Sequence, residues 1–182
     1  MKEIVIVPAW RRPDFLAATL ERLGAADEGH QHYWISLDRR FDKQVGQIAN
    51  QFVHRFGPVR VKVLQRMHPY QGNSYNVLRS YEEAIKAGYE MIHLVEEDIF
   101  VADDYFAFHR AAHQLLPDVF AVSGARNQNY PNDPDPDPGA VYLAPQYQSV
   151  AVSFRAHVLA PVMKHAVSSY YHNPIRYCRR AF

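Results

Sequence analysis

The 182-residue sequence has almost no net charge, a single cysteine and no long hydrophobic run. A formal charge of +1 gives no electrostatic reason to expect nucleic acid or an anionic membrane as a partner. One cysteine, Cys178, excludes an internal disulfide framework and is typical of a reducing compartment. No apolar stretch reaches membrane-spanning length and no charged leader precedes a cleavage site, so we expect a cytoplasmic protein without a membrane span.

Up to residue 118, short apolar runs alternate with segments whose apolar residues recur at helical spacing. The runs predict strands, and the segments between them predict helices. Strands that alternate with helices are typical of an α/β fold with a mostly parallel, Rossmann-like sheet flanked by helices. Ligands of such sheets bind at the carboxyl ends of the strands. The predicted strands cover residues 3–8, 32–37, 59–65 and 91–95.

The remaining third of the chain is less regular. Residues 119–124 predict one more strand, and residues 127–139, built largely of Asn, Asp and Pro, predict a long loop. Residues 140–145 and 148–154 alternate as the two strands of a small antiparallel hairpin would, and a short helix follows them. No linker interrupts the sequence, so we expect a single domain over residues 1–182.

The helix predicted after residue 104 carries two histidines. His109 and His113 lie four residues apart and could share a metal ion. The glutamate of the metalloprotease pattern is missing between them, however, and no third ligand is obvious, so we expect both on the polar face of the helix. The buried stripe of this helix is predicted to consist of Tyr105, Phe108, Ala112 and Leu115.

Three consecutive carboxylates, Glu96, Glu97 and Asp98, follow the apolar run 92–95. Carboxylates at the end of a buried strand destabilise the fold unless a cation neutralises them. A divalent ion such as Mn²⁺ or Mg²⁺ would do so, because it takes oxygen ligands and usually completes its shell with water and substrate phosphates. The alternative is that the three side chains cap the strand in solvent, with Asp98 beginning a turn.

The order of these motifs resembles nucleotide-sugar-dependent glycosyltransferases of the GT-A fold. The likeness rests on "VPAWRRPDFLAATLERL" at the amino end, Asp38 after the second strand, "QGNSYNVLRSYEEA" before the fourth strand and "VEEDIFVADDYFAFHRAAHQLL" after it. It is greatest to the protein N-acetylglucosaminyltransferase I type, in which a strand ending in Glu-Asp-Asp precedes an acidic turn and an aromatic-rich helix. The resemblance covers residues 3 to about 168, and implies a GT-A-like fold.

The resemblance also implies roles for the acidic residues. Asp98 would be the metal ligand, bridging Mn²⁺ or Mg²⁺ to the diphosphate of the donor. Glu97 would hold the donor ribose or a metal-bound water, and Glu96 would support the site. Asp38 would accept a hydrogen bond from the uracil or ribose, although it could equally cap a turn.

Four further residues match positions that contact or approach the nucleotide in that family. Pro8 and Arg11 lie in the first strand-to-helix loop, although Arg11 and Arg12 could instead be a solvated pair. Gly72 and Asn76 match the segment that passes under the nucleotide, where a small residue permits close backbone approach. Residues 73–76 could equally be an ordinary helix cap.

The implied activity is transfer of a sugar from a UDP-sugar to an acceptor hydroxyl, with residues 1–118 binding the nucleotide-sugar and residues 119–182 forming the acceptor side. An inverting enzyme needs a base, but Asp137 is the last carboxylate in the sequence. The candidates for the base are therefore Asp137 and His172. A retaining mechanism, or an incomplete acceptor half, is also compatible with the sequence.

Two alternatives keep the nucleotide and change the chemistry. The first is a nucleotide-binding or nucleotide-sugar-binding module without transferase activity. The second is a nucleotidyltransferase, which usually has a Gly-rich loop containing Lys or Arg after its first strand. The corresponding segment here, "PAWRRPD", has no glycine, and no Walker-type loop occurs elsewhere.

Overall fold

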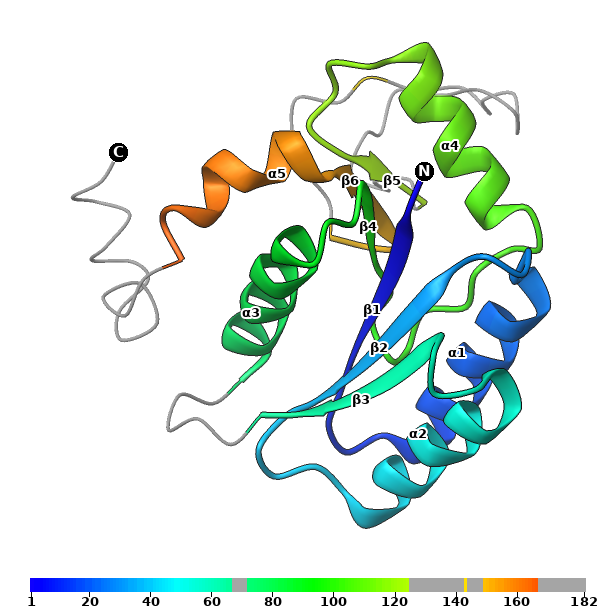
Figure 1. The fold of residues 1–182 in the computed structure, drawn as a ribbon. Helices are drawn as coiled ribbons and strands as arrows, with labels where there is room; N and C mark the ends of the chain where they lie inside the picture. The colour runs from blue at the N-terminus through cyan, green and yellow to red at the C-terminus, as the bar shows by residue number, and fades with distance from the viewer. Residues whose placement is uncertain (67–71, 125–142, 144–148, 167–182) are drawn as a thin grey trace, which may run out of the picture.

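The computed structural model describes residues 1–66, 72–124, 143 and 149–166 (Figure 1). Strands and helices alternate through most of this part of the chain, as the sequence predicts. The elements are β1 (Glu3–Ala9), α1 (Pro13–Ala26), β2 (His32–Leu37), α2 (Lys43–Phe56), β3 (Val61–Gln65), α3 (Asn73–Lys86), β4 (Met91–Leu94), α4 (Tyr105–Leu115), β5 (Val122–Ser123), β6 (Val152–Arg155) and α5 (Ala156–Met163).

The described strands form one six-stranded sheet in the order β3-β2-β1-β4-β6-β5. The first four are parallel, whereas β6 runs antiparallel to both β4 and β5. The chain passes from β1 outward to β2 and β3, then returns through α3 to place β4 on the other side of β1. The order of strands therefore reverses between β1 and β4, the point where ligands of open α/β sheets bind.

Helices cover both faces of the sheet (Figure 1). All seven residues of β1 are buried, as expected for a strand at the centre of a parallel sheet. Val5 and Val7 point to the core beneath α1, α2 and α4, whereas Ile4 and Ile6 point to the core beneath α3 and α5. The alternation along β1 thus supplies both cores.

The predicted α/β architecture and its antiparallel hairpin are confirmed. The partner of the second hairpin strand differs in part from expectation, because β6 pairs with β4 on one side and with the two-residue β5 on the other. The predicted first strand of the hairpin, residues 140–145, lies outside the described residues apart from Leu143.

The buried face predicted for α4 is correct for Tyr105 and Ala112 but wrong for the other two residues. Phe108 and Leu115 are 36% and 76% exposed, whereas His109 and His113 are completely buried. The reason is Ser153 of β6, whose Oγ lies 2.6 Å from His109 Nδ1 and 2.9 Å from His113 Nε2. A hydroxyl supplied from a distant strand lets the imidazoles enter the core, while burial lowers the pKa of both.

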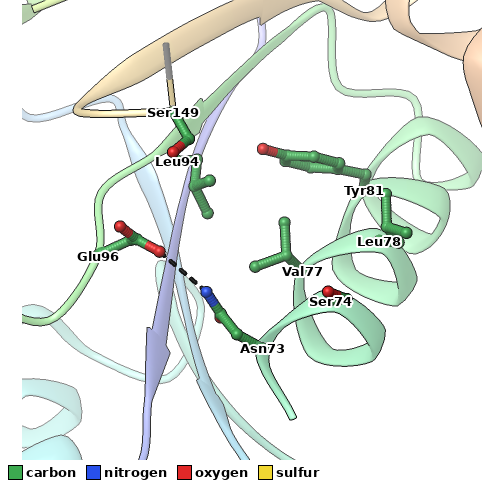
Figure 2. A pocket seen from close by; sticks show the side chains of 8 residues that line it. All are labelled: Asn73, Ser74, Val77, Leu78, Tyr81, Leu94, Glu96 and Ser149. Atoms are coloured by element: carbon green, nitrogen blue, oxygen red, sulfur yellow. Dashed lines mark hydrogen bonds between the residues drawn. The ribbon is translucent and has the colours of Figure 1, made fainter. Parts of the chain in front are cut away.

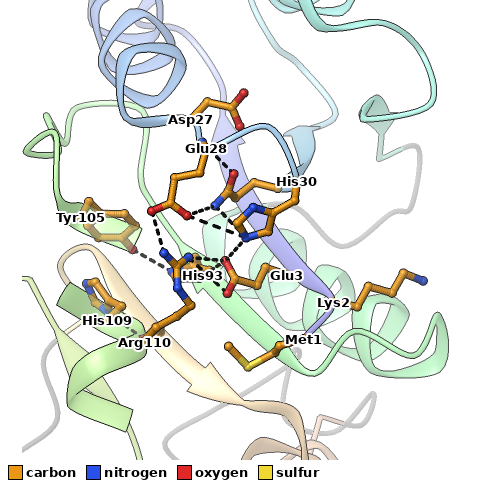
Figure 3. A network of polar contacts seen from close by, with 12 residues as sticks. Met1, Lys2, Glu3, Asp27, Glu28, His30, His93, Tyr105, His109 and Arg110 are labelled. Atoms are coloured by element: carbon orange, nitrogen blue, oxygen red, sulfur yellow. Dashed lines mark hydrogen bonds and ion pairs between the residues drawn. The ribbon is translucent and has the colours of Figure 1, made fainter. Parts of the chain in front are cut away.

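A polar network closes the amino end of β1 (Figure 3). Arg110 Nη1 lies 3.4 Å from the buried carboxylate of Glu3, and Arg110 Nη2 donates to Glu28 at 2.6 Å. The hydrogen bond from Arg110 lowers the pKa of Glu28. His93 Nδ1 lies 3.3 Å from the hydroxyl of Tyr105. The charges of Glu3, Glu28 and Arg110 are therefore paired with one another at this end of the strands. The candidate site lies at the opposite end, where the parallel strands have their carboxyl ends.

Candidate functional site

The candidate site lies at the carboxyl ends of β1 and β4, the neighbouring strands between which the strand order reverses. Their ladder ends where Ile6 pairs with Leu94, and the N–H of Val95 donates to the carbonyl of Ile6 at 3.0 Å. β1 continues to Ala9 beside β2 alone. Beyond Val95, side chains rather than ladder hydrogen bonds connect the two strand ends.

Glu97 makes that connection. Its carboxylate is 5% exposed, and accepts hydrogen bonds from the N–H of Trp10 and from Nε of Arg12, both at 2.9 Å. Its backbone carbonyl accepts a further bond from the hydroxyl of Thr19 on α1 at 2.8 Å. Both carboxylate oxygens therefore have partners, and Glu97 joins the loop after β4 to the loop after β1.

Asp98 shares the guanidinium of Arg12, with 2.5 Å between Nη1 and Oδ2. The Asp98 and Arg12 side chains are 34% and 49% exposed, so this pair borders solvent. The hydrogen bond to Glu97, followed by that to Asp98, raises the pKa of Arg12. An internal cation thus neutralises two of the three acids, and Arg12 is not half of a solvated pair with Arg11.

Arg11 points elsewhere. Its Cζ lies 4.5 Å from the centre of the Trp10 ring, and its Nε donates to the carbonyl of Arg40 at 3.3 Å. The N–H of Asp42 donates to the carbonyl of Trp10 at 2.8 Å. These contacts hold the loop after β1 against the loop after β2.

Glu96 lies at the mouth of a pocket of about 220 Å³ between α3, the end of β4 and Ser149 (Figure 2). Its Oε1 accepts a hydrogen bond from Nδ2 of Asn73 at 2.9 Å. Val77 and Leu94 line the pocket with apolar groups. The lining combines apolar and polar groups, as ligand sites do, although its volume is below the roughly 300–1,000 Å³ of most of them.

Asp38 and Gly72 meet at the end of β2. Oδ2 of Asp38 accepts the N–H of Gly72 at 3.0 Å, and Oδ1 accepts the N–H of Arg39 at 2.7 Å. Gly72 has a φ of +100°, and an added Cβ would meet no described atom within 4 Å. The positive φ by itself favours glycine here, and the predicted close approach of a nucleotide stays a prediction.

Asn76 and Pro8 are buried, which limits what they can contact. Nδ2 of Asn76 donates to the carbonyl of Ser36 at 2.7 Å, and its Oδ1 accepts the hydroxyl of the same serine. Pro8 lies inside β1, in register with Ser36. Asn76 thus fixes α3 to β2, and any role it has toward a nucleotide would be indirect.

The fold brings eight of the sequence-predicted residues to one edge of the sheet, although their roles in binding stay predictions. These are Pro8, Arg11, Asp38, Gly72, Asn76, Glu96, Glu97 and Asp98. Asp137 and His172, the candidates for the base, lie outside the described residues. Arg12 was missed by the sequence reasoning. Its role could have been found from its position in the loop after β1. If β1 and β4 are neighbours in the sheet, that loop lies beside the acids that follow β4.

Among the described residues, few side chains at this site could act as ligands of a divalent metal. In this part of the chain, no group of three or more His, Cys, Asp or Glu side chains is arranged to hold a metal. Glu97 has both oxygens engaged, which leaves Asp98 as the exposed carboxylate beside Arg12. An ion held by Asp98 would take its remaining ligands from water and ligand phosphates, as Mg²⁺ commonly does.

Comparison with known proteins establishes the fold. No protein-family model matches the sequence, and no curated protein matches it significantly. Among solved structures, the chain is similar to the mannosyltransferase PcManGT of Pyrobaculum calidifontis in complex with GDP-Man and Mn²⁺, with a TM-score of 0.57, 15% identity, and coverage of 69% of this chain and 36% of that one. It is also similar to S. aureus TarS 1–349 in complex with UDP-GlcNAc, with a TM-score of 0.66, 17% identity, and coverage of 89% and 47%.

A third similar structure is a CMP:2-keto-3-deoxy-manno-octonic acid synthetase complexed with CTP, with a TM-score of 0.52, 13% identity, and coverage of 100% of this chain and 86% of that one. The fold is therefore GT-A-like, and this chain spans less than half of the length of the two glycosyltransferases. The particular likeness to the N-acetylglucosaminyltransferase I type stays a prediction. No helix within the described ranges has the length and apolar character needed to cross a membrane.

Proposed function

We propose that this chain binds a nucleotide-sugar, with UDP as the nucleotide, and transfers its sugar to an acceptor hydroxyl. The observation that carries the proposal is the grouping of Asp38, Glu97, Asp98 and Arg12 at the reversal point of a GT-A-like sheet. Similar structures carry GDP-Man with Mn²⁺ and UDP-GlcNAc. A cytoplasmic location, which the single cysteine favours, is part of the same proposal.

Each acidic residue has a distinct place in this proposal. Asp38, whose two oxygens accept from the amides of Gly72 and Arg39, would use a remaining lone pair to accept from the uracil or ribose. Glu97 would keep the two strand-end loops in register, because its carboxylate is buried and fully engaged. Asp98 would hold Mn²⁺ or Mg²⁺, which stabilises the charge on the departing diphosphate when it is bound.

Nothing among the described residues is assigned as the base that accepts the acceptor proton. Asp137 and His172 stay the candidates for an inverting reaction, whereas a retaining reaction needs no dedicated base. Transfer or hydrolysis of UDP-sugars with Mn²⁺ tests for turnover. UDP binding without turnover would favour a binding module over an enzyme.

The proposed role of Asp98 as a metal ligand is tested by calorimetric titration of UDP into the protein, first in the presence of Mn²⁺ and then in the presence of excess EDTA. Asp98→Asn should abolish the Mn²⁺-dependent part of UDP binding, because an amide is a poorer ligand for a hard cation than a carboxylate. Asp103→Asn is the matched control, since Asp103 lies five residues further on with a side chain that is 80% exposed. Tight Mn²⁺-dependent binding by Asp98→Asn would exclude this metal site.

A nucleotidyltransferase is the second candidate, and the coverage of the synthetase favours it. This chain matches that structure over 100% of its own length and 86% of the other, against 36% and 47% for the two glycosyltransferases. The missing glycine in the first loop argues against it. Release of inorganic diphosphate from CTP or UTP with sugar phosphates would select this candidate, and transfer from UDP-sugars would select the first.

A further inference from the structure

We propose that Arg12 is the residue that binds the diphosphate of the nucleotide ligand. This inference rests on the proposed function, and adds to it the group that recognises the phosphates. The guanidinium uses Nε for Glu97 and Nη1 for Asp98. Within the described residues Nη2 has no partner, and the side chain is 49% exposed. Arg12 therefore presents unused N–H donors to solvent at the edge where strand order reverses.

The two carboxylates hold Arg12 unequally. The bond to Glu97 involves a carboxylate that is 5% exposed, and removing a partner from a buried ion pair is strongly destabilising. The bond to Asp98 lies at the surface, where such pairs contribute little to stability. Glu97 thus fixes Nε, while Nη1 can exchange Asp98 for another anionic oxygen at small cost.

The anchored guanidinium has the geometry that phosphate requires. With Nε held on Glu97, Nη1 and Nη2 form the outward fork of the side chain. A fork of two N–H groups matches two oxygens of a phosphate and binds it more specifically than a point charge. The ring of Phe15 lies 6.0 Å from Cζ of Arg12, which places an aromatic face beside the guanidinium.

Arginines from two loops lie near this position. Arg39 and Arg40 follow β2, and the contact of Arg11 with the carbonyl of Arg40 joins their loop to that of Arg12. Four arginines thus lie on two adjoining loops of a chain whose overall formal charge is only +1. Asp38, Asp42 and the acids that follow β4 lie at the same end of the sheet, so a diphosphate would be recognised here by individual arginine donors rather than by a net positive field.

The proposed metal would change the partner of Asp98. If Asp98 bound Mn²⁺ or Mg²⁺, Nη1 of Arg12 would be released to donate to a phosphate oxygen of the diphosphate. Asp98 would then be paired with the metal, and Arg12 with Glu97 and the phosphate. Arg11 differs because its Nε bonds to a backbone carbonyl of the loop after β2, so no buried carboxylate orients its guanidinium.

The test compares UDP, uridine and inorganic diphosphate as calorimetric ligands of wild-type and variant proteins. Arg12→Gln alone would leave Glu97 charged and buried, so the paired variant Arg12→Gln/Glu97→Gln is the main perturbation. It removes both charges and keeps an amide oxygen for the N–H of Trp10. Arg22→Gln is the matched control, because Arg22 lies on α1 and pairs with the exposed Asp103.

The paired variant should bind UDP and inorganic diphosphate about tenfold to a hundredfold more weakly, the loss expected for hydrogen bonds to a charged group. Its affinity for uridine should match wild type, and Arg22→Gln should match wild type for all three ligands. Equal losses for UDP and uridine, or unchanged UDP binding, would reduce Arg12 to a structural counter-ion and overturn the inference.

The same titrations separate this inference from the proposed function. A wild-type protein that binds inorganic diphosphate through Arg12 but not UDP would support the inference and contradict the UDP donor. A wild-type protein that binds UDP independently of Arg12 would do the reverse. A wild-type protein that binds none of the three ligands would overturn both.

Discussion

Replacing Glu97 with Ala should destabilise the fold far more than replacing either neighbouring acid. Two charge-assisted hydrogen bonds at 2.9 Å are lost, one from the N–H of Trp10 and one from Arg12. Bonds of this kind contribute about 1.5–3 kcal/mol each. The exposed half of Arg12 regains water, and the burial of a carboxylate is relieved, so the net loss in free energy of unfolding should be about 2–3 kcal/mol.

Urea denaturation followed by circular dichroism measures this loss. With a slope of about 2 kcal/mol per molar, the midpoint should fall by about 1–1.5 M. Glu96→Ala is the control, since Glu96 makes a single exposed hydrogen bond to Asn73 and should cost below about 1 kcal/mol. If the two variants differ by less than about 0.5 kcal/mol, Glu97 does not join the strand ends in the way described, because its bonds would then contribute no more than a surface contact.

Two further predictions concern buried polar side chains. Burial lowers the pKa of His109 to about 3, so the unfolded chain binds a proton that the folded chain does not between that value and about 6.5. The contribution of neutral His109 to stability is therefore fully present above about pH 6.5 and is lost as the pH falls. Between pH 7 and pH 5, the free energy of unfolding of His109→Gln, measured by urea titration, should fall by about 2 kcal/mol less than that of wild type. Identical losses would contradict this. Asn76→Ala should cost about 1–3 kcal/mol by the same assay, because the buried carbonyl of Ser36 loses the amide donor of Asn76, whereas the hydroxyl of Ser36 keeps its contacts with Ser80 and Arg66. Asn73→Ala at the exposed start of α3 should cost less, and equal losses would show that Asn76 does not fix the helix.

The parallel part of the sheet could be predicted because its signals are local. The apolar run predicted over residues 3–8 is the strand Glu3–Ala9, and the run predicted over 91–95 is Met91–Leu94. A strand buried on both faces is recognisable from its own composition, without knowledge of its neighbours. The right-handed crossovers then fix on which face of the sheet each helix lies, but they do not fix the order of the strands.

The burial of the two histidines of α4 could not be predicted, because their hydrogen-bond partner is distant in sequence. Spacing alone places Phe108 and Leu115 inside, since apolar side chains are usually the ones buried. The hydroxyl that bonds to one ring nitrogen of each of His109 and His113 comes from Ser153, 44 and 40 residues away. Burial of a polar group depends on such a partner, and a single helix does not reveal it.

The acidic triplet was identified from sequence, but the division of tasks within it was not. Adjacent residues at a strand end point in different directions, and the loop conformation decides which one turns inward. Here Glu97 is buried while Asp98 borders solvent. For the same reason, the sequence could not distinguish Arg11, which lies over Trp10, from Arg12, which lies on the acids.

The hydrogen bond from the Trp10 amide to Glu97 has a consequence for experiments on this protein. The acceptor of this amide is a side-chain carboxylate on the other strand end, not a carbonyl of the sheet. Its exchange with deuterium is therefore slowed only while that one hydrogen bond is formed. Loosening of the loops would expose it to solvent while the ladder amides of β1 stay protected. A single backbone resonance in an NMR spectrum would therefore report the closure of this edge without substrate or turnover.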